Sequence, residues 1–400
     1  MSRPVVVCHL PTMTGWGGVE RMVEDVLLRS AATGEAHHLL APSWSPEVVA
    51  PIEAAGIPML LLHRQSRYDP RGIAQAVTWL RRKHVTILHA YNAFANIWGL
   101  ALSRLAGVPV FIAGEHGTVW RTSGALFQLD RLAQRTAAAV VANSEAAAAL
   151  VEQRYGVAPA SIQVIANAVA PLPVVDREAL RRSLGLEGAP VVGSVGRLDN
   201  PKDQQTLLEA AALALAQRDD LRFVLVGGGP LEAELRARLQ QLGLSERFIM
   251  TGWRSDAREL IQAFDLFVGT SVRESFGNVF VEAALAGLPV IASAVDGIPE
   301  VVADGQTGCL LRPKLPIRPS TAPGATPIGA IALIDGRLSP PRALDPAELA
   351  QAILDLMADP ERRRRLGKEA RRRAQLRSGL DRHIMELTDL YQRLAGLAVG

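Results

Sequence analysis

The chain alternates between apolar runs of strand length and segments of helix length, and this alternation limits the folds open to it. In its first half the apolar runs are continuous, so both faces of each strand should be buried, as in a parallel sheet between helices. These runs cover residues 5–10, 38–41, 58–62, 86–89, 108–113, 139–142 and 162–165, and helices are expected over 19–29, 70–83 and 125–137.

The pattern stops at the proline-containing segment 171–176 and then starts again. New apolar runs cover residues 190–196, 223–226, 248–250, 266–268 and 290–292. A repeated alternation predicts an α/β chain of two doubly wound, Rossmann-like domains, 1–175 and 187–379. Ligands of such sheets bind at the carboxyl ends of the strands, so we expect the two domains to face a central cleft.

Residues 312–344 interrupt the second alternation, because ten of these 33 residues are proline or glycine. We interpret them as a mobile surface insertion, with a strand or hairpin over 328–336. Deletion of residues 314–342 should then leave folding intact. Helices are expected over 346–358 and 360–377. The arginine-rich face of the second is interpreted as a solvated surface. A last helix, 380–400, is expected to pack back on the N-terminal domain.

Composition places the chain among soluble globular proteins, with 48% hydrophobic and 21% charged residues. The net charge of +3 is too small to indicate a nucleic-acid partner. Cys8 and Cys309 each lie in an apolar run, so we expect buried thiols rather than a disulfide. The N-terminal apolar run is too short for a signal sequence or a membrane span. The prediction is a cytoplasmic protein with possible peripheral contact with the inner membrane.

Two carboxylates flank the start of one predicted helix in the second half. Glu274 follows the apolar run that ends at 268, and Glu282 lies about one turn inside the next helix. Between them, the amides of Phe276, Gly277 and Asn278 have no helical partner and lie at the positive end of the helix dipole. This arrangement suits a ligand with hydroxyls at both ends and phosphate in the middle, such as a nucleotide sugar.

Cations and glycines occupy other turns between strands and helices. Arg197 and Lys202 follow the first strand of the second half, where a guanidinium fork and an ammonium can grip one diphosphate. Glycines at 15, 17 and 18 follow the first strand of the chain, and glycines at 227–229 follow another strand. A turn without side chains allows close approach of the backbone to phosphate.

His116 follows the fifth predicted strand, where it could hydrogen-bond a sugar hydroxyl or transfer a proton. His9 and His89 also lie near strand ends, but they lack supporting neighbours and are predicted to be core residues. The sequence shows no spacing typical of a metal site, a P-loop or an activated nucleophile. The chemistry suggested by these residues therefore relies on cations and amides.

Taken in order and spacing, these motifs resemble the retaining glycosyltransferases of family 4, which have the GT-B fold and are also called glycosyl transferases group 1. The resemblance extends over nearly the whole chain. It is carried by residues 17–20, 115–117, 143–144, 196–198 with Lys202, 227–229, 251–252, Glu274 with Glu282, 287–292 and 297–300.

The resemblance implies same-face transfer of a sugar from a nucleotide diphosphate sugar to an acceptor hydroxyl. The expected setting is synthesis of a bacterial cell-surface polysaccharide or glycolipid, and the acceptor would be a sugar, a lipid-linked molecule or a small molecule. No cofactor and no metal are implied, since the donor is a co-substrate. The catalytic residues would be His116, Arg197, Lys202 and Glu274. The donor-binding residues would be Gly17, Gly18, Gly196, Gly228, Arg254, Phe276, Gly277, Asn278, Val279 and Glu282.

Two features depart from the family pattern. Asn167 is kept from the loop that usually reads Pro-Asn-Gly, but its neighbours are not, and the insertion 312–344 replaces a short connection. Three other functions stay open at this point. They are a sugar-nucleotide epimerase or hydrolase of the same fold, a non-catalytic nucleotide-sugar-binding protein, and a glycoside hydrolase that uses Glu274 and Glu282 across one bond.

Overall fold

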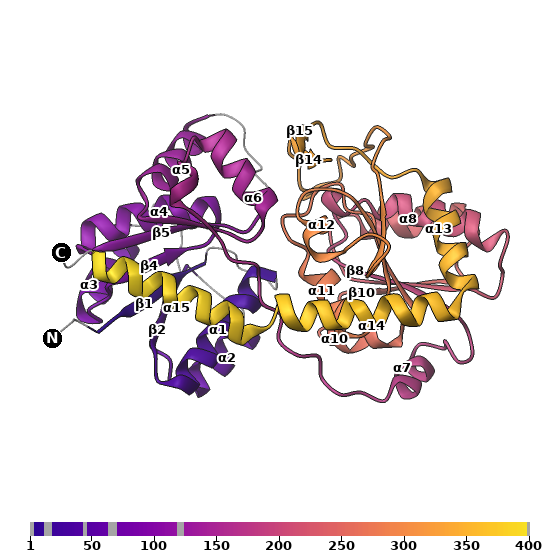
Figure 1. Ribbon diagram of the computed structural model, residues 1–400, viewed down its shortest axis with the longest axis horizontal. Helices are drawn as coiled ribbons and strands as arrows, with labels where there is room; N and C mark the ends of the chain where they lie inside the picture. Colours follow the sequence, from indigo (N-terminus) through magenta and orange to yellow (C-terminus); the bar gives the residue numbers. More distant parts are fainter. Residues whose placement is uncertain (1–3, 12–17, 43–45, 63–69, 118–123, 398–400) are drawn as a thin grey trace. The chain divides into compact units, whose positions relative to one another are not determined.

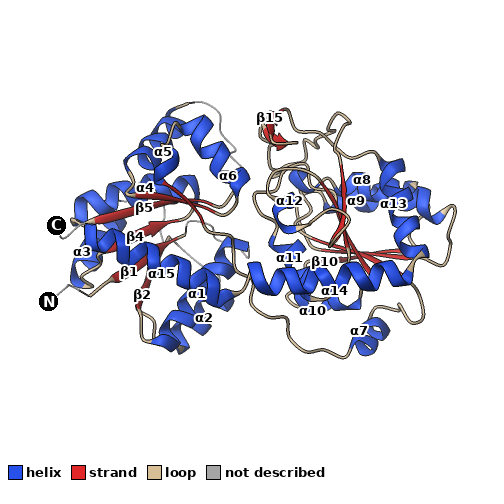
Figure 2. Ribbon diagram, viewed as in Figure 1, coloured by secondary structure: helices blue, strands red, loops and turns tan. Residues whose placement is uncertain are grey.

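Two parallel sheets, one in each half of the chain, organise the structure. It is a computed structural model that describes residues 4–11, 18–42, 46–62, 70–117 and 124–397. The chain divides into unit 1, Met1–Ala170 with Leu380–Gly400, and unit 2, Pro171–Gly379. In each unit the strands lie between helices (Figures 1 and 2). The predicted α/β class with two parallel-sheet, Rossmann-like domains is confirmed.

Unit 1 contains a seven-stranded sheet of order β3-β2-β1-β4-β5-β6-β7. Every neighbouring pair is parallel, as the continuous apolar runs predicted. The strands are β1 (Val6–Leu10), β2 (Ala36–Ala41), β3 (Met59–Leu61), β4 (Ile87–Ala90), β5 (Val110–Glu115), β6 (Ala139–Ala142) and β7 (Ile162–Val164). The helices are α1 (Gly18–Thr33), α2 (Pro46–Ala54), α3 (Pro70–Arg82), α4 (Asn92–Ala106), α5 (Ala125–Thr136) and α6 (Glu145–Leu150).

The last helix of the chain, α15 (Leu380–Leu397), completes unit 1. Its side chains Leu387, Leu390 and Tyr391 are buried in the same cluster as Val7 and Ile87 of the central strands. The Tyr391 hydroxyl also lies 2.8 Å from Nδ1 of His89. Unit 1 is therefore built from both ends of the sequence.

Unit 2 contains a six-stranded parallel sheet of order β10-β9-β8-β11-β12-β13. Five of these strands match predicted runs, and β13 is an addition that the prediction did not include. The strands are β8 (Val191–Val195), β9 (Arg222–Val226), β10 (Phe248–Gly252), β11 (Leu266–Gly269), β12 (Val290–Ser293) and β13 (Gly308–Leu311). The helices are α7 (Arg177–Ser183), α8 (Gln204–Leu215), α9 (Glu232–Gln241), α10 (Ala257–Leu260), α11 (Asn278–Leu285), α12 (Ile298–Val301), α13 (Pro346–Ala358) and α14 (Pro360–Arg377).

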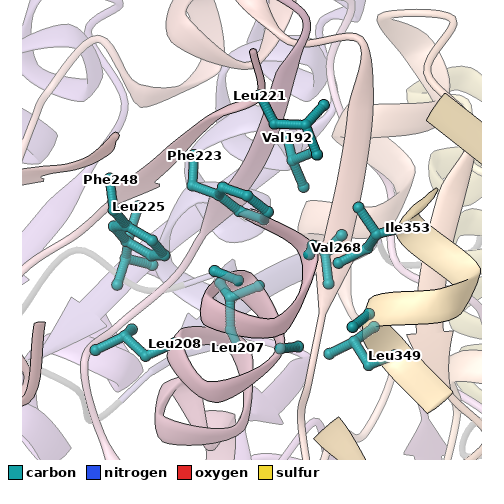
Figure 3. Close-up of a cluster of buried hydrophobic side chains, with 14 of the residues drawn as sticks. Val192, Leu207, Leu208, Leu221, Phe223, Leu225, Phe248, Val268, Leu349 and Ile353 are labelled. Atoms are coloured by element: carbon teal, nitrogen blue, oxygen red, sulfur yellow. The ribbon is translucent and has the colours of Figure 1, made fainter. Parts of the chain in front are cut away.

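The core on one face of this sheet shows why the strands carry continuous apolar runs (Figure 3). Phe223 and Phe248, on neighbouring strands, stack with ring centroids 5.7 Å apart. The same cluster contains Leu207 of α8, and Ile353 of α13, which lies beside Val268, and its members are almost fully buried. A second cluster on the unit contains Phe264, Phe267 and Phe280. Burial on both faces fixes the parallel sheet.

The insertion 312–344 forms a hairpin, as the sequence suggested for 328–336, and this hairpin is anchored in the core of unit 2. It contains an antiparallel hairpin of β14 (Ala332–Ile334) and β15 (Arg337–Ser339), which lies near α12 in Figure 1. Ala332 is fully buried and Ile334 is 8% exposed, and both belong to the second hydrophobic cluster of unit 2. Most of the segment lies at the surface, as predicted, but proline and glycine content reports only turns and could not show that these two side chains are buried.

The arginine-rich helix α14 is only partly a solvated surface. Arg363 donates to the carbonyl oxygens of Leu356 and Met357 at 2.7 and 2.8 Å, and Arg373 donates to that of Glu300 at 3.0 Å. These arginines donate hydrogen bonds to carbonyl oxygens of neighbouring helices.

Both cysteines are free thiols; Cys8 is buried, as predicted, and Cys309 is half-buried. Among the described residues, no helix has the length and apolar character of a bilayer span.

Candidate functional site

The candidate site of unit 2 lies where the direction of strand order reverses. β8 lies in the middle of the sheet, with β9 on one side and β11 on the other, so the loops after β8 and β11 leave toward opposite faces. Doubly wound sheets bind ligands at this switch point, outside the carboxyl ends of the strands. The residues singled out in these two loops therefore lie where a ligand is expected.

The loops after β8 and β11 are joined by backbone and side-chain contacts. The amide of Val272 donates to the carbonyl oxygen of Pro201 at 2.9 Å, and the Thr270 hydroxyl donates to that of Lys202 at 2.9 Å. The ammonium of Lys202 pairs with the carboxylate of Glu274, and the two side chains are 27% and 14% exposed. A predicted cation and a predicted carboxylate are thus brought into direct contact.

Arg197, the other predicted cation, has an exposed side chain that is tethered at one end. Its guanidinium lies 3.2 Å from Asp199 Oδ2. The side chain of Arg197 is 57% exposed, whereas that of Asp199 is 4% exposed. Gln204, at the start of α8, donates to the carbonyl oxygen of Arg197 at 2.8 Å. The backbone of the loop is therefore fixed while the guanidinium stays open to solvent.

The glycine turn after β9 packs directly against this loop. Gly227 has a φ of +146°, and a Cβ built on it would lie 1.9 Å from the carbonyl oxygen of Gly196. The next residue, Gly228, accepts a hydrogen bond of 3.0 Å from the amide of Leu198. Glycine at 227 is therefore required for close packing of two backbones, since a side chain would separate the turn from the cation loop.

A buried ion pair that the sequence reading missed supports the Glu274 loop. Arg273 and Asp296 are each about 1% exposed, and Nε lies 2.8 Å from Oδ2. The same oxygen accepts the amide of Glu274 at 3.0 Å. Burial raises the pKa of Asp296, and the neighbouring Arg273 opposes that rise. The charge on Asp296 is therefore compensated where it orders the backbone of Glu274.

Gly297, which follows Asp296, allows the loop after β12 to reach that backbone. A Cβ on Gly297 would lie 2.1 Å from the carbonyl oxygen of Ser275, and its amide donates to that of Glu274 at 3.0 Å. Asp296 itself has a φ of +46°, a conformation that aspartate tolerates in tight turns. The Asp-Gly pair at 296–297 was the one sequence signal that could have pointed to this support.

Helix α11 carries the second carboxylate. Gly277, in the left-handed region at φ +91°, precedes the helix, and Phe276 beside it is 4% exposed. Glu282, within α11, lies 3.5 Å from Nε of Arg258 in α10, and both side chains are 15% exposed. Val279 packs on the second hydrophobic cluster of unit 2. Glu274 and Glu282 thus each pair with a different cation.

Two predicted donor-binding residues, Gly228 of the glycine turn and Arg254, lie at or near Trp253. A Cβ on Gly228 would lie 3.0 Å from Cβ of Trp253, whose side chain is 61% exposed. The neighbouring Arg254 pairs with Asp256 through two contacts of 2.7 and 2.6 Å. The structure therefore gives Arg254 a local partner and does not join it to Arg197 or Lys202 by a contact.

Unit 1 places His116 directly after β5 in a polar setting. Its Nδ1 lies 3.3 Å from the side-chain oxygen of Asn167, and its amide donates to that of Asn92 at 2.9 Å. Burial lowers the pKa of His116 to about 4, and the Asn167 contact opposes this shift. The ring is therefore neutral near pH 7. His9 and His89 are fully buried, as predicted for core residues.

The remaining predicted residues of unit 1 belong to the first glycine loop. Gly18 is the first residue of α1. Gly17 lies outside the described residues. Metal-ligand groups of three or more His, Cys, Asp or Glu side chains do not occur in the part of the chain that the structure describes.

The chain matches two protein-family models, one in each half. Residues 16–171 match "Glycosyltransferase Family 4" and residues 176–318 match "Glycosyl transferases group 1". The chain belongs to the group 1 glycosyltransferases. The resemblance deduced from the sequence motifs is confirmed by these matches.

Individual relatives of this group 1 family member support the assignment. A D-inositol 3-phosphate glycosyltransferase of Mycobacterium sp. (strain KMS) is 34% identical over 312 residues, 73% of this chain and 66% of the relative. A 2-deoxystreptamine glucosyltransferase of Streptomyces kanamyceticus is 31% identical over 245 residues, 56% of this chain and 63% of the relative. The aligned regions thus span less than two thirds of these curated relatives.

Solved structures show the same GT-B fold. Anabaena HepE, solved in complex with UDP and glucose, has a TM-score of 0.79 at 22% identity over 97% of this chain and 100% of its own. Sucrose-phosphate synthase of Thermosynechococcus elongatus has a TM-score of 0.75 at 20% identity over 98% and 100%. At these identities the likeness concerns the fold, which is the one that the sequence predicted.

Proposed function

We propose that the chain transfers a sugar from a nucleotide diphosphate sugar to an acceptor hydroxyl with retention of anomeric configuration. The observation that carries the proposal is the contact between Lys202 and Glu274, from the loops after β8 and β11, at the switch point of the unit 2 sheet. Family membership supports it. Unit 2 would bind the donor, and unit 1 would bind the acceptor.

The leaving group of this reaction is a nucleoside diphosphate, whose charge increases as the bond to the sugar breaks. Arg197 and Lys202 would neutralise that charge, the first through an exposed guanidinium and the second through an ammonium at the switch point. On the same face, the acceptor oxygen would bond to the sugar carbon while its proton moves to the departing phosphate. This route needs neither a protein nucleophile nor a metal.

The two carboxylates would hold the hydroxyl-bearing ends of the donor. Glu274 would accept hydrogen bonds from the sugar, together with the amides of residues 276–278, while Glu282 would accept them from the ribose. The neutral ring of His116 would offer a hydrogen bond to a sugar hydroxyl rather than a positive charge.

Replacing Glu282 with alanine is expected to weaken donor binding. Hydrogen bonds to a charged group are worth about 1.5–3 kcal/mol, so the donor Kd should rise roughly 10- to 100-fold. Isothermal titration with the donor would measure the change. The matched control is Glu361→Ala on the exposed start of α14, which should leave the Kd unaltered. An unaltered Kd in the Glu282 variant would remove the assigned ribose contact.

The product is expected to keep the anomeric configuration of the donor sugar. Nuclear magnetic resonance of the isolated product, from the coupling constant of the anomeric proton, gives the configuration directly. The acceptor panel should include polyhydroxylated small molecules, since 2-deoxystreptamine and D-inositol 3-phosphate appear in the names of relatives. Saccharides and lipid-linked saccharides complete it, because the resemblance points to bacterial cell-surface synthesis. An inverted product would contradict the same-face route.

The alternatives are separated by simple observations. An epimerase or hydrolase of the same fold would turn over the donor without an acceptor, which chromatography detects. A non-catalytic binding protein would be stabilised by the donor without turning it over. A glycoside hydrolase would need Glu274 and Glu282 as a pair across one bond, whereas the structure pairs them with Lys202 and Arg258.

A further inference from the structure

The insertion 312–344 contacts both loops of the candidate donor site. At its base, Leu315 and Ala343 form an antiparallel bridge, with amide-to-carbonyl distances of 3.0 and 2.8 Å. Between these residues the chain leaves toward the loop after β8 and returns through the hairpin β14–β15. The hairpin is anchored by buried Ala332 and Ile334. The insertion therefore has a closed base and a fixed internal support.

Its first arm, residues 320–326, binds the cation loop through two buried polar side chains. Asn200 donates to the carbonyl oxygens of Ser320 and Thr326 at 2.9 and 3.1 Å and accepts the amide of Ser320 at 2.7 Å. Asp199 accepts the amide of Thr326 at 2.7 Å through Oδ1 and its hydroxyl through Oδ2. Asp199 and Asn200 are 3% and 6% exposed.

The carboxylate of Asp199 links this arm to Arg197. The oxygen that accepts the Thr326 hydroxyl is Oδ2, which also lies 3.2 Å from the guanidinium of Arg197. The other oxygen accepts the amide of Asn200 at 2.9 Å as well as that of Thr326. A carboxylate with all these partners is fixed in orientation. Its Oδ2 interacts with the Thr326 hydroxyl and with Arg197 at the same time, so the two compete for one oxygen.

The second arm, at β14, binds the Glu274 loop in a similar way. The amide of Leu333 donates to Oδ1 of Asp296 at 2.8 Å, and the amide of Asp296 donates to the carbonyl oxygen of Leu333 at 2.8 Å. The other oxygen of Asp296 accepts Nε of Arg273 and the amide of Glu274. Each arm therefore meets a buried aspartate that also contacts a predicted donor-site residue.

We infer that the insertion 312–344 is a positioning element of the donor site, with Thr326 positioning Arg197 through Asp199 and the Leu333 backbone positioning Glu274 through Asp296. The inference rests on the proposed function, since it assigns a role to the same site. It gives the segment a role that its interpretation as a surface insertion did not include. The donor diphosphate would bind an arginine whose ion pair with Asp199 is loosened and oriented by the insertion.

The test is Thr326→Val, which removes the hydroxyl and keeps the shape of the side chain. Asp199 Oδ2 then has Arg197 as its remaining side-chain partner, so the ion pair becomes stronger. A stronger ion pair with Asp199 holds the guanidinium away from the diphosphate. The probe is whichever of UDP, GDP and ADP most stabilises the wild-type chain against heat. Its Kd and the donor KM are expected to rise about tenfold, and Thr326→Ser should restore them. Thr321→Val, at an exposed threonine of the same arm, should change neither.

Amide hydrogen exchange supplies a readout that does not depend on activity. In Thr326→Val, exchange across residues 196–203 should become faster than in the wild type or in Thr321→Val. For the second arm, binding of the probe to the wild type should slow exchange at Leu333. If Thr326→Val has the same Kd and the same exchange rates as the wild type, the inference is overturned and the proposed function is unaffected. A wild-type chain that binds no nucleoside diphosphate would overturn both.

Discussion

Replacing Lys202 with alanine is expected to lower kcat for sugar transfer by about 10²- to 10³-fold, the effect of removing one preorganised charge-stabilising donor. Lys202 is the cation that the structure holds in contact with Glu274 between the loops after β8 and β11. Without it, the charge that develops on the departing diphosphate is met by Arg197 alone. Steady-state kinetics with saturating donor measures the change.

The fold should survive this substitution, since the Lys202 side chain is 27% exposed and lies outside the hydrophobic clusters. The matched control is Lys368→Ala, at an exposed lysine on α14, which should keep wild-type kcat. Circular dichroism of both variants separates loss of chemistry from loss of structure. Wild-type turnover by Lys202→Ala would remove the leaving-group role assigned to this residue.

Acidification from about pH 6.5 to about pH 4 is expected to remove several kcal/mol from the free energy of unfolding of unit 1. Burial lowers the pKa of His37, His116 and His383 to about 4 and holds those of His9 and His89 well below the ordinary value. The unfolded chain, with histidine pKa values near 6.5, binds more protons in this window. Stability is therefore present above pH 6.5 and lost as the pH falls.

The loss of unfolding free energy per buried histidine sets the size of this effect. A pKa of about 6.5 in the unfolded chain and about 4 in the folded chain corresponds to about 3 kcal/mol of stability across the window. Glu35, whose carboxylate lies 3.7 Å from His37, opposes the effect at that residue. Glu24, whose pKa burial raises to about 7, takes up a proton in folded unit 1 over the same window and offsets part of the loss.

Urea unfolding at a series of pH values tests this linkage. His383→Asn removes one buried titrating group, so the dependence of the unfolding free energy on pH should become shallower by about one proton. The control is His84→Asn, because His84 is exposed and its φ of +52° is one that asparagine tolerates. A wild-type unfolding free energy that stays constant between pH 7 and pH 4.5 would contradict the assignment of these buried rings as neutral.

Much of the fold follows from local sequence patterns. Parallel strands buried on both faces leave continuous apolar runs, and these located every strand of unit 1 and five strands of the unit 2 sheet. A helix starting between Glu274 and Glu282 was also expected, and α11 begins there, at Asn278. The contact of Lys202 with Glu274 follows from the same topology, since both residues come after strands that flank the switch point.

Other parts depend on contacts between residues far apart in the chain. The bonds between Asp199 or Asn200 and the insertion span 120 to 127 residues, and nothing local marks them. The buried pair of Arg273 and Asp296 looks in the sequence like two surface charges, because burial of a charge is decided by tertiary packing. The family pattern likewise offers no guide to residues 312–344, where this chain departs from it.

A crystal structure of the chain with the nucleoside diphosphate that stabilises it most would show where the donor binds. We predict that the diphosphate contacts Arg197 and Lys202 at the carboxyl ends of β8 and β11, and that the ribose hydroxyls contact Glu282. A nucleotide bound elsewhere, with no contact to Lys202 or Glu282, would contradict this prediction.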